Sequence, residues 1–216
     1  MKTKLPSIFP ADYSHSFNPF IYNAVPSGMS VLDVGCWNGN LGKILINKKN
    51  CIVDGIDNNK VILGQAKKNG YKTNYPINLN TEPKKLKKIT NRYDVIICAD
   101  ILEHLTDPEY VLKLLKSLLK SDGVIIISVP NVAFGLNRWN LLKGEWDYTE
   151  FGTLDKTHLR FFTARTLKEL VMKTGLIIEC FKPYNQFGIL SKISPLDQIW
   201  PTFLCFQLLL IAKNEK

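Results

Sequence analysis

Short apolar runs alternate along the chain with segments in which apolar residues recur at helical spacing. The apolar runs, rich in Val and Ile, predict strands at residues 30–35, 51–57, 71–79, 93–98 and 124–129. Apolar positions three and four apart predict helices at residues 40–47, 60–69 and 107–119. Asp122-Gly123 predicts a turn before the fifth strand. Alternation of this kind predicts a parallel sheet covered by helices on both faces.

The pattern changes after Pro130. Residues 131–162 are rich in aromatic and charged residues with little periodicity, which is typical of a binding loop inside a compact domain. Residues 163–174 predict a helix with Thr163 as its N-cap, and residues 176–181 and 203–212 predict two more strands. We therefore expect one domain over residues 1–216, with an aromatic-rich insert at about 131–162.

Composition agrees with a single globular domain. The chain has 216 residues, of which 45% are hydrophobic and 22% charged, and this excludes a disordered, collagenous or coiled-coil chain. The apolar run at 203–212, interrupted by Gln207, is shorter than the roughly 20 residues of a membrane span, and residues 1–10 lack the apolar core of a signal peptide. We expect a cytoplasmic protein without a transmembrane segment, whose five scattered cysteines are reduced, buried thiols.

The net charge of +9 comes mainly from lysine, which supplies 24 of the 28 basic residues. Proteins that read nucleic-acid sequence rely on Arg, so this balance predicts no nucleic-acid partner. The dense run Lys84-Lys85-Leu86-Lys87-Lys88 has two interpretations. It is either a solvated helix face or a surface attracted to anions, which would permit peripheral membrane association.

The segment from Val31 to Asn40 predicts a strand that runs into a glycine-containing turn and then a helix. Such a turn lies at the carboxyl edge of a parallel sheet, where ligands bind. Asp57, at the end of the second strand, can accept both hydrogen bonds of a ribose diol. The spacing Gly35-x-x-x-Gly39 departs from the dinucleotide fingerprint, and Asp33 suits a cationic amino-acid group better than a pyrophosphate. S-adenosylmethionine carries such a group, whereas an ordinary turn without a ligand is the alternative.

Several motifs together resemble class I S-adenosylmethionine-dependent methyltransferases. The chain is similar in particular to the group of ubiquinone-biosynthesis O-methyltransferases, methionine-biosynthesis protein W and glycan-associated methyltransferases. The resemblance rests on the loop at 33–39, on Asp57, on Asn78-Leu79, on the Leu-Glu-His motif in residues 99–105 and on residues 155–163. It implies a Rossmann-like three-layer sandwich with a mostly parallel seven-stranded sheet and an antiparallel last strand.

The resemblance also implies a set of cofactor-binding residues, with S-adenosyl-L-methionine as the cofactor. They are Asp33, Gly35, Cys36, Trp37, Gly39, Asp57, Asn58, Asn78, Leu79, Ala99 and His104. Trp37 replaces a glycine of the family's loop and is expected to point away from the cofactor or to stack near it. Residues 13–16 resemble a helix that often closes over the cofactor.

Two histidines are candidate catalysts because an oxygen nucleophile must lose its proton. His158 lies beside Arg160 in the insert and is either a base or a group that docks the insert onto the sheet; His104 follows Glu103. Asp100, Glu103 and His104 share one side of a possible helical turn and are candidate metal ligands, or else a structural corner. Candidate substrate-binding residues are Asn131, Trp139, Trp146 and Arg160, although the aromatic residues could equally form the core of the insert.

These features predict a methyltransferase acting on a small-molecule or glycan acceptor, expected at oxygen. The alternative is a non-catalytic, accessory subunit of the same fold that binds a protein partner. An RNA or DNA methyltransferase is a third interpretation, but the Asn/Asp-Pro-Pro-Tyr/Phe motif of the amino-methylating enzymes is absent.

Overall fold

The computed structural model describes residues 18–184 and 202–214. The strands are β1 (Ser30–Val34), β2 (Ile52–Asp57), β3 (Asn74–Pro76), β4 (Tyr93–Ala99), β5 (Leu119–Pro130), β6 (Leu176–Tyr184) and β7 (Gln207–Asn214). The α-helices are α1 (Pro19–Ala24), α2 (Asn40–Lys49), α3 (Lys60–Lys68), α4 (Pro108–Lys116), α5 (Gly135–Leu142) and α6 (Ala164–Lys173). Two 3₁₀ helices, η1 (Pro83–Lys88) and η2 (Leu102–His104), precede β4 and α4 respectively.

The strands form one seven-stranded sheet in the order β3-β2-β1-β4-β5-β7-β6. Strands β1 to β5 pair in parallel, whereas β7 lies antiparallel between β5 and β6. Because the order reverses between β1 and β4, the carboxyl ends of these two strands face the crevice in which open α/β sheets bind ligands. The predicted fold class, including the antiparallel last strand, is confirmed.

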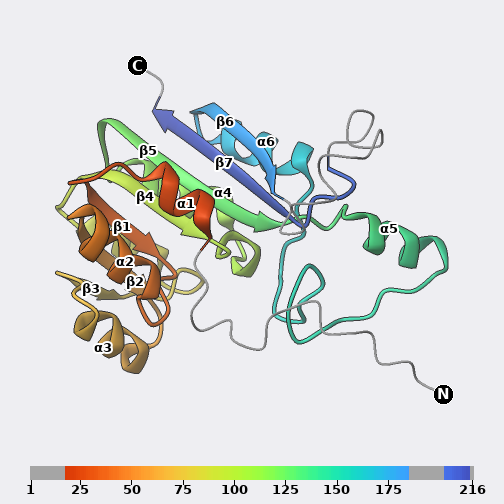
Figure 1. Ribbon diagram of the computed structural model, residues 1–216, viewed down its shortest axis with the longest axis horizontal. Helices are drawn as coiled ribbons and strands as arrows, with labels where there is room; N and C mark the ends of the chain where they lie inside the picture. Colours follow the sequence, from red (N-terminus) through yellow and green to blue (C-terminus); the bar gives the residue numbers. More distant parts are fainter. Residues whose placement is uncertain (1–17, 185–201, 215–216) are drawn as a thin grey trace.

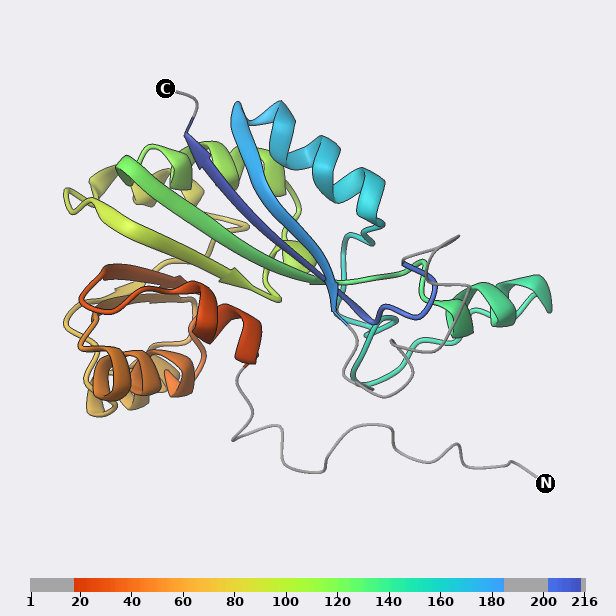
Figure 2. The same cartoon turned by 45° about the horizontal axis from the view of Figure 1, so that its top comes forward.

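Helices cover the sheet on both faces, so it is the middle layer of three (Figures 1 and 2). Helices α1, α2 and α3 lie on one face, where Leu45 and Ala66 pack against Val53. Helices α4 and α6 lie on the other face, where Leu112 and Leu167 belong to a second buried cluster. The central strands are buried on both sides, which explains their continuous apolar runs.

Three predicted elements differ from the structure. Strand β3 spans three residues rather than 71–79, because Tyr71 turns its ring under the sheet and pairs with Asp33. The predicted turn at Asp122-Gly123 lies inside β5, at a register shift against β4. The last strand begins at Gln207 rather than at residue 203.

The end of the insert follows the sequence pattern. Thr163 caps α6 as predicted, since its hydroxyl accepts from the Thr166 amide while the Thr166 hydroxyl accepts from the Thr163 amide. The earlier part of the insert contains a helix that the sequence pattern did not predict, α5, which projects beyond the edge of the sheet (Figure 2). The predicted helix at 13–16 and residues 185–201, between β6 and β7, lie outside the described residues.

Four of the five cysteines are buried and Cys180 is half-buried, as the sequence predicts. Burial raises the pKa of the Cys36 and Cys98 thiols far above its usual range, so both are neutral. Within residues 18–184 and 202–214, no helix combines the length and apolar character that crossing a bilayer requires.

Candidate active site

The turn after β1 is shaped by glycines where other residues would clash. Gly39 precedes α2 in the left-handed region with φ of 80°, and a Cβ there would lie 2.8 Å from the Cα of Ala66. Gly42, in the first turn of α2, leaves room for the ring of Tyr71, whose hydroxyl oxygen accepts from the Gly42 amide at 3.1 Å. The sequence therefore brings α2 close to the sheet and places Tyr71 beneath β1.

Asp33 is buried beneath this turn and does not line a cavity. Its side chain is 3% exposed and accepts a 2.6 Å hydrogen bond from the Tyr71 hydroxyl. Burial raises the pKa of Asp33 to about 6, although the bond from Tyr71 opposes the shift. Direct contact with a cationic ligand, as expected from the sequence, does not follow from this placement because Tyr71 already occupies the carboxylate.

Asp57 ends β2 at the same edge of the sheet. Its half-buried carboxylate accepts from the amides of Trp37 at 3.1 Å and of Asn59 at 2.9 Å. Trp37 is the left-handed residue of the turn, with φ of 48°, and its side chain is 64% exposed. The indole is therefore largely exposed to solvent and is not among the residues that line the cavity beside Asp57.

This first cavity lies at the carboxyl ends of β1, β2 and β3 and above η2. Of the eleven predicted cofactor-binding residues, six line it: Gly35, Asp57, Asn58, Asn78, Leu79 and His104. Asp33, Cys36, Trp37, Gly39 and Ala99 instead shape the strands and turns behind it. The sequence analysis missed Ile56, Ile77, Asn80, Ile101 and Leu105. Asn80 had a recognisable signal, because it lies two residues after Asn78.

Asn80 connects the two sides of this cavity. Its amide nitrogen donates to the carbonyl oxygen of His104 at 2.9 Å, and its amide oxygen accepts from the Thr106 backbone at 2.8 Å. The segment after β3 is thereby fastened to the segment after β4, which carries the Glu-His motif.

Asp100 begins that segment in the left-handed region, with φ of 49°. Both of its carboxylate oxygens accept from the side-chain amide of Gln207 on β7, at 2.7 and 2.8 Å, and one accepts from the Ser128 hydroxyl at 3.1 Å. Gln207 in turn accepts from Asn18 at 2.8 Å. The last strand thus holds the loop after β4 in a left-handed conformation that, besides glycine, Asp and Asn adopt most readily.

Glu103 is the least satisfied polar side chain in this region. It is 1% exposed, and neither of its carboxylate oxygens has a hydrogen-bond partner among the described residues. Burial, and then the nearby charge of Asp100, raises the pKa of Glu103 well above its usual range. A buried carboxylate in this state needs a proton, a cation or a ligand that donates hydrogen bonds.

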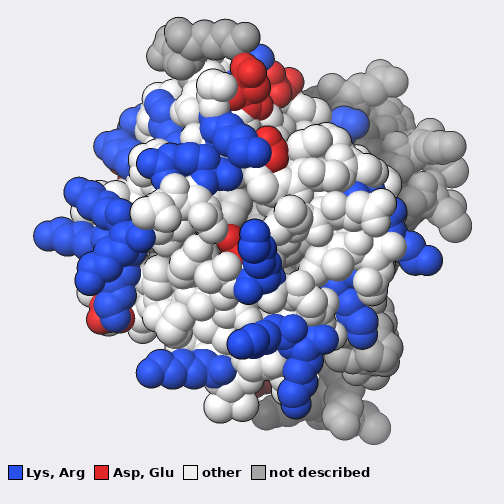
Figure 3. Space-filling view, turned by 90° about the vertical axis from the view of Figure 1, so that its left-hand side faces the viewer, with Lys and Arg blue, Asp and Glu red and all other residues white. Residues whose placement is uncertain are grey.

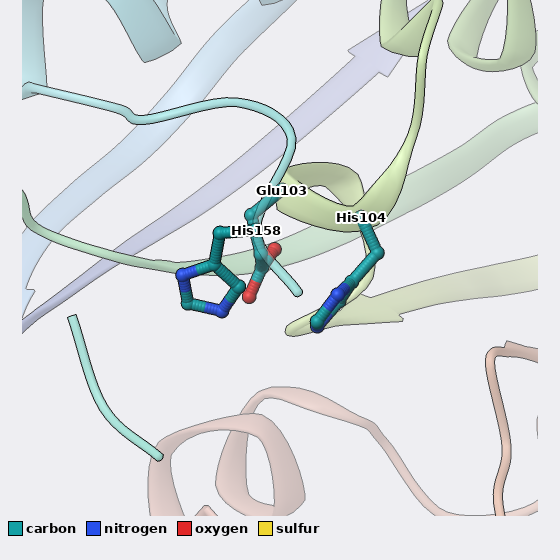
Figure 4. Close-up of side chains that lie close together, drawn as sticks. All are labelled: Glu103, His104 and His158. Atoms are coloured by element: carbon teal, nitrogen blue, oxygen red, sulfur yellow. The ribbon is translucent and has the colours of Figure 1, made fainter. Parts of the chain in front are cut away.

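Two imidazole rings flank this carboxylate. The rings of His104 and His158 have centroids 4.9 Å apart, and Figure 4 shows the carboxylate of Glu103 between them in that view. The backbone of the insert is tied to the same point, because the amides of Leu159 and Arg160 both donate to the Glu103 carbonyl oxygen. Burial and the neighbouring His104 lower the pKa of His158. His158 is therefore neutral near pH 7 and able to accept a proton.

Glu103, His104 and His158 also have the ligand types of a divalent-cation site. One ligand atom from each lies within 4.8 Å of the others, and imidazole with carboxylate suits Zn, Fe and Ni. Asp100, predicted as a ligand, is not in this group because Gln207 and Ser128 hold its carboxylate. The helical turn assumed for residues 100–104 is the three-residue η2, and Asp100 precedes it.

A second cavity opens beside these three side chains. Its volume is about 170 Å³, and its lining includes Asp100, Glu103, His158, Phe151 and Phe206. That volume is below the roughly 300–1,000 Å³ usual for drug-sized ligands. His104 lines both cavities, which therefore adjoin at its ring.

The four predicted substrate-binding residues lie around this cavity rather than in it. Asn131 is fully buried, and its side-chain amide donates to the carbonyl oxygens of Thr202 and Cys205, so it supports the chain beside the cavity rather than lining it. Trp139 is exposed on α5, and Trp146 packs edge-on against Phe161. The guanidinium of Arg160 donates to the Thr106 carbonyl oxygen and so fastens the insert to the loop after η2.

Comparison with known proteins agrees with this geometry. Residues 12–180 match a family described as a methyltransferase domain. The chain is 33% identical over 135 residues to a ubiquinone biosynthesis O-methyltransferase of Coxiella burnetii, and the match covers 57% of each chain. It is 31% identical over 166 residues to the Pasteurella multocida protein of that name, with 63% of this chain and 67% of the relative covered. The chain thus spans little more than half the length of the Coxiella relative.

A solved structure shows the same fold at lower identity. A SAM-dependent methyltransferase from Archaeoglobus fulgidus superimposes with a TM-score of 0.62 at 20% identity, over 91% of this chain and 90% of that one. The predicted resemblance is confirmed, because the family match extends over most of the sheet and the insert. The chain belongs to the methyltransferase domain family and has the fold of class I S-adenosylmethionine-dependent methyltransferases.

Proposed function

We propose that this chain transfers a methyl group from S-adenosylmethionine to an oxygen atom of a small-molecule or glycan acceptor. The observation that carries the proposal is the meeting of two cavities at His104, one beside Asp57 and the other beside His158. In-line displacement requires the acceptor oxygen, the methyl carbon and the sulfur to lie in a row. Two adjoining cavities, one for the cofactor and one for the acceptor, suit that arrangement.

The residues of the first cavity fit an adenosyl group. Asp57 offers a half-buried carboxylate to a ribose diol. Asn78 offers its side-chain amide to a purine edge, and Leu79 offers an apolar contact to the ring. When bound, S-adenosylmethionine supplies an electrophilic methyl group on a positively charged sulfur, so its leaving group needs no proton.

The residues of the second cavity act on the acceptor. The acceptor hydroxyl loses its proton as the carbon–oxygen bond forms, and His158 is the group that takes it. The positive charge that forms on His158 favours the ionised form of the neighbouring Glu103, and the resulting carboxylate stabilises the imidazolium. Phe151 and Phe206 exclude water from one side of the reacting group.

Calorimetric titration tests the cofactor part of the proposal. S-adenosylmethionine and S-adenosylhomocysteine are expected to bind, and NAD is not. Asp57→Ala should weaken S-adenosylhomocysteine binding by about 100-fold, because two hydrogen bonds to a charged group are lost. The matched control is Glu82→Ala, an exposed acid outside the cavity, which should leave the affinity unchanged. Binding of NAD alone would contradict the proposal.

A transfer assay with labelled methyl groups and a panel of phenols, nucleotide sugars and oligosaccharides tests the catalytic part. His158→Ala should lower turnover by about 100-fold or more and leave S-adenosylhomocysteine affinity intact. Unchanged turnover in this variant would remove His158 from the mechanism. Cofactor binding without transfer, together with a stoichiometric protein partner, would favour the accessory-subunit alternative.

A further inference from the structure

The positive charge of the chain is concentrated in one part of the molecule. Residues 40–90 contain 11 lysines, no arginine and three acidic residues, a net charge of +8. The other 165 residues hold 17 basic and 16 acidic residues, so almost the whole net charge of +9 lies in this segment. Ten of the 11 lysines are exposed, and we refer to these ten as the lysine face.

The lysine face surrounds the β3 edge of the sheet. Lys48 lies in the last turn of α2, Lys67 and Lys68 lie in the last turn of α3, and Lys72 precedes β3. The lysines of η1 lie where Leu86 packs into the cluster that contains α4. Figure 3 looks onto the end of the molecule that carries β3 and α3, where basic side chains far outnumber acidic ones.

The lysines of this face are largely without acidic partners. Of the seven ion pairs among the described residues, six lie outside residues 40–90, and the remaining one joins Lys85 to Glu82. Of the other two acids in the segment, Asp54 is buried and Asp57 belongs to the first cavity. The face therefore presents uncompensated charge to an external anion.

We propose that the lysine face docks the protein on an anionic phospholipid surface. Each Lys near such a surface gains from its negative potential, and the gain needs no pocket or fixed geometry. The chemistry of the face favours lipid over nucleic acid. Its cations are all Lys, and among the described residues of the segment Tyr71 is buried and Tyr75 half-buried, so no exposed ring is available for stacking on bases.

Docking through the lysines near the amino ends of the strands keeps a bilayer away from the cavities. Lys48 and Lys67 lie in the last turns of helices that lead into the amino ends of β2 and β3, whereas both cavities lie at the carboxyl ends of the strands. Lys43 and Lys60, in the first turns of α2 and α3, are the members of the face that lie on the cavity side. A bilayer bound at the amino ends would thus hold the enzyme close to a membrane with its cavities directed away from the lipid.

Co-sedimentation with vesicles tests the proposal. The full chain should bind vesicles of phosphatidylcholine with about 30% phosphatidylglycerol at low salt, should not bind phosphatidylcholine alone, and should dissociate at about 1 M salt. A quadruple variant with Gln in place of Lys67, Lys72, Lys84 and Lys88 should bind at least about tenfold more weakly.

The matched control replaces Lys113, Lys156, Lys168 and Lys173 by Gln, which removes the same charge from outside the face. It should keep vesicle affinity within about twofold of the unmodified chain. Equal losses in both variants, absence of binding to anionic vesicles, or tighter binding to a uridine oligonucleotide than to vesicles would each overturn the proposal. S-adenosylhomocysteine titration of the same samples separates this result from the proposed function, since both variants should bind it unchanged.

Discussion

The cofactor side and the acceptor side of the strand edge differ in how their buried acids are satisfied. On the cofactor side, Asp33 has a hydroxyl partner in Tyr71, and Asp57 accepts from two backbone amides. On the acceptor side, the carboxylate of Glu103 is equally buried and has no partner among the described residues. One side is complete within the chain, whereas the other has a polar group that a bound molecule would satisfy.

The difference reflects what each side must do. A cofactor cavity binds one molecule, so its acids can be fixed in place beforehand and lose little on binding. A buried carboxylate without a partner destabilises the free protein, and such strain is commonly found where a ligand or a reaction supplies compensation. The following substitutions measure this difference in free energies of unfolding.

The largest effect is expected for Asp33→Asn, compared with the unmodified chain across pH. The folded protein holds a proton on Asp33 up to a pKa of about 6, against an ordinary value of 3.8, so Asp33 favours folding below about pH 4. This contribution is lost as the pH rises to about 6, by about 3 kcal/mol in total. Asn cannot ionise, so urea unfolding at about pH 4 and pH 7 should show that difference between the two proteins.

A control variant, Glu82→Gln, removes an exposed acid and should follow the pH dependence of the unmodified chain. If Asp33→Asn also follows it, Asp33 is not the buried titrating group that distinguishes the cofactor side.

Gln207→Leu should leave the buried carboxylate of Asp100 short of hydrogen-bond donors, as the carboxylate of Glu103 already is. The substitution leaves the Asp100 carboxylate with the Ser128 hydroxyl and without the amide of β7, and should cost about 2 kcal/mol of unfolding free energy. Gln65→Leu, on the exposed surface of α3, is the matched control. Its free energy of unfolding should lie within about 0.5 kcal/mol of that of the unmodified chain. Equal effects would mean that the bond to Asp100 is energetically unimportant.

Glu103→Leu should act in the opposite direction. The carboxylate of Glu103 has no hydrogen-bond partner among the described residues, so its removal leaves no buried donor unpaired. Replacing it by an apolar side chain of similar size should therefore raise the free energy of unfolding by about 1.5 kcal/mol at about pH 8. Thermal or urea unfolding with EDTA present measures the change in the metal-free protein. Destabilisation would show that the carboxylate is already satisfied and would remove the contrast between the two sides.

Trp37→Gly should give the smallest effect. Trp37 holds a left-handed φ that glycine adopts without cost, and its indole is exposed, so the variant should gain about 1 kcal/mol in stability. Asn50→Gly, at a similar φ, should change the free energy of unfolding by only about 0.3 kcal/mol, because Asn tolerates the left-handed region. A large loss for Trp37→Gly would show that the indole packs more firmly than its exposure indicates.

The cofactor side was predictable because local sequence encodes it. The strand, the turn and the helix that carry Gly35 lie within a few residues of one another, and Asp57 is placed by the next strand. Tyr71 was wrongly predicted to lie in a strand. Its contact with Asp33 joins residues 38 positions apart, and the local hydrophobic pattern gives no sign of such a contact. The short β3 follows from the same contact, which draws residue 71 out of the sheet.

The acceptor side depends on contacts at greater separation. Asp100 and Gln207 lie 107 positions apart, so no local pattern joins them. One signal was present, since Gln207 is the single polar residue in the apolar run at 203–212. The turn expected at Asp122-Gly123 lies within β5, at the register shift where the pairing with β4 passes from Leu119 to Val124.

The position of β7 between β5 and β6 has a consequence for biosynthesis. The ribosome delivers β6 before its sheet neighbour exists, and it delivers β5 with one edge still open. Gln207 follows at the start of the strand that closes this gap, so Asp100 acquires its clamp only after β6 and the segment that follows it have been translated. The nascent chain can thus assemble the part that contains β1 to β4 early, while the loop after β4 is held in place only once β7 has emerged.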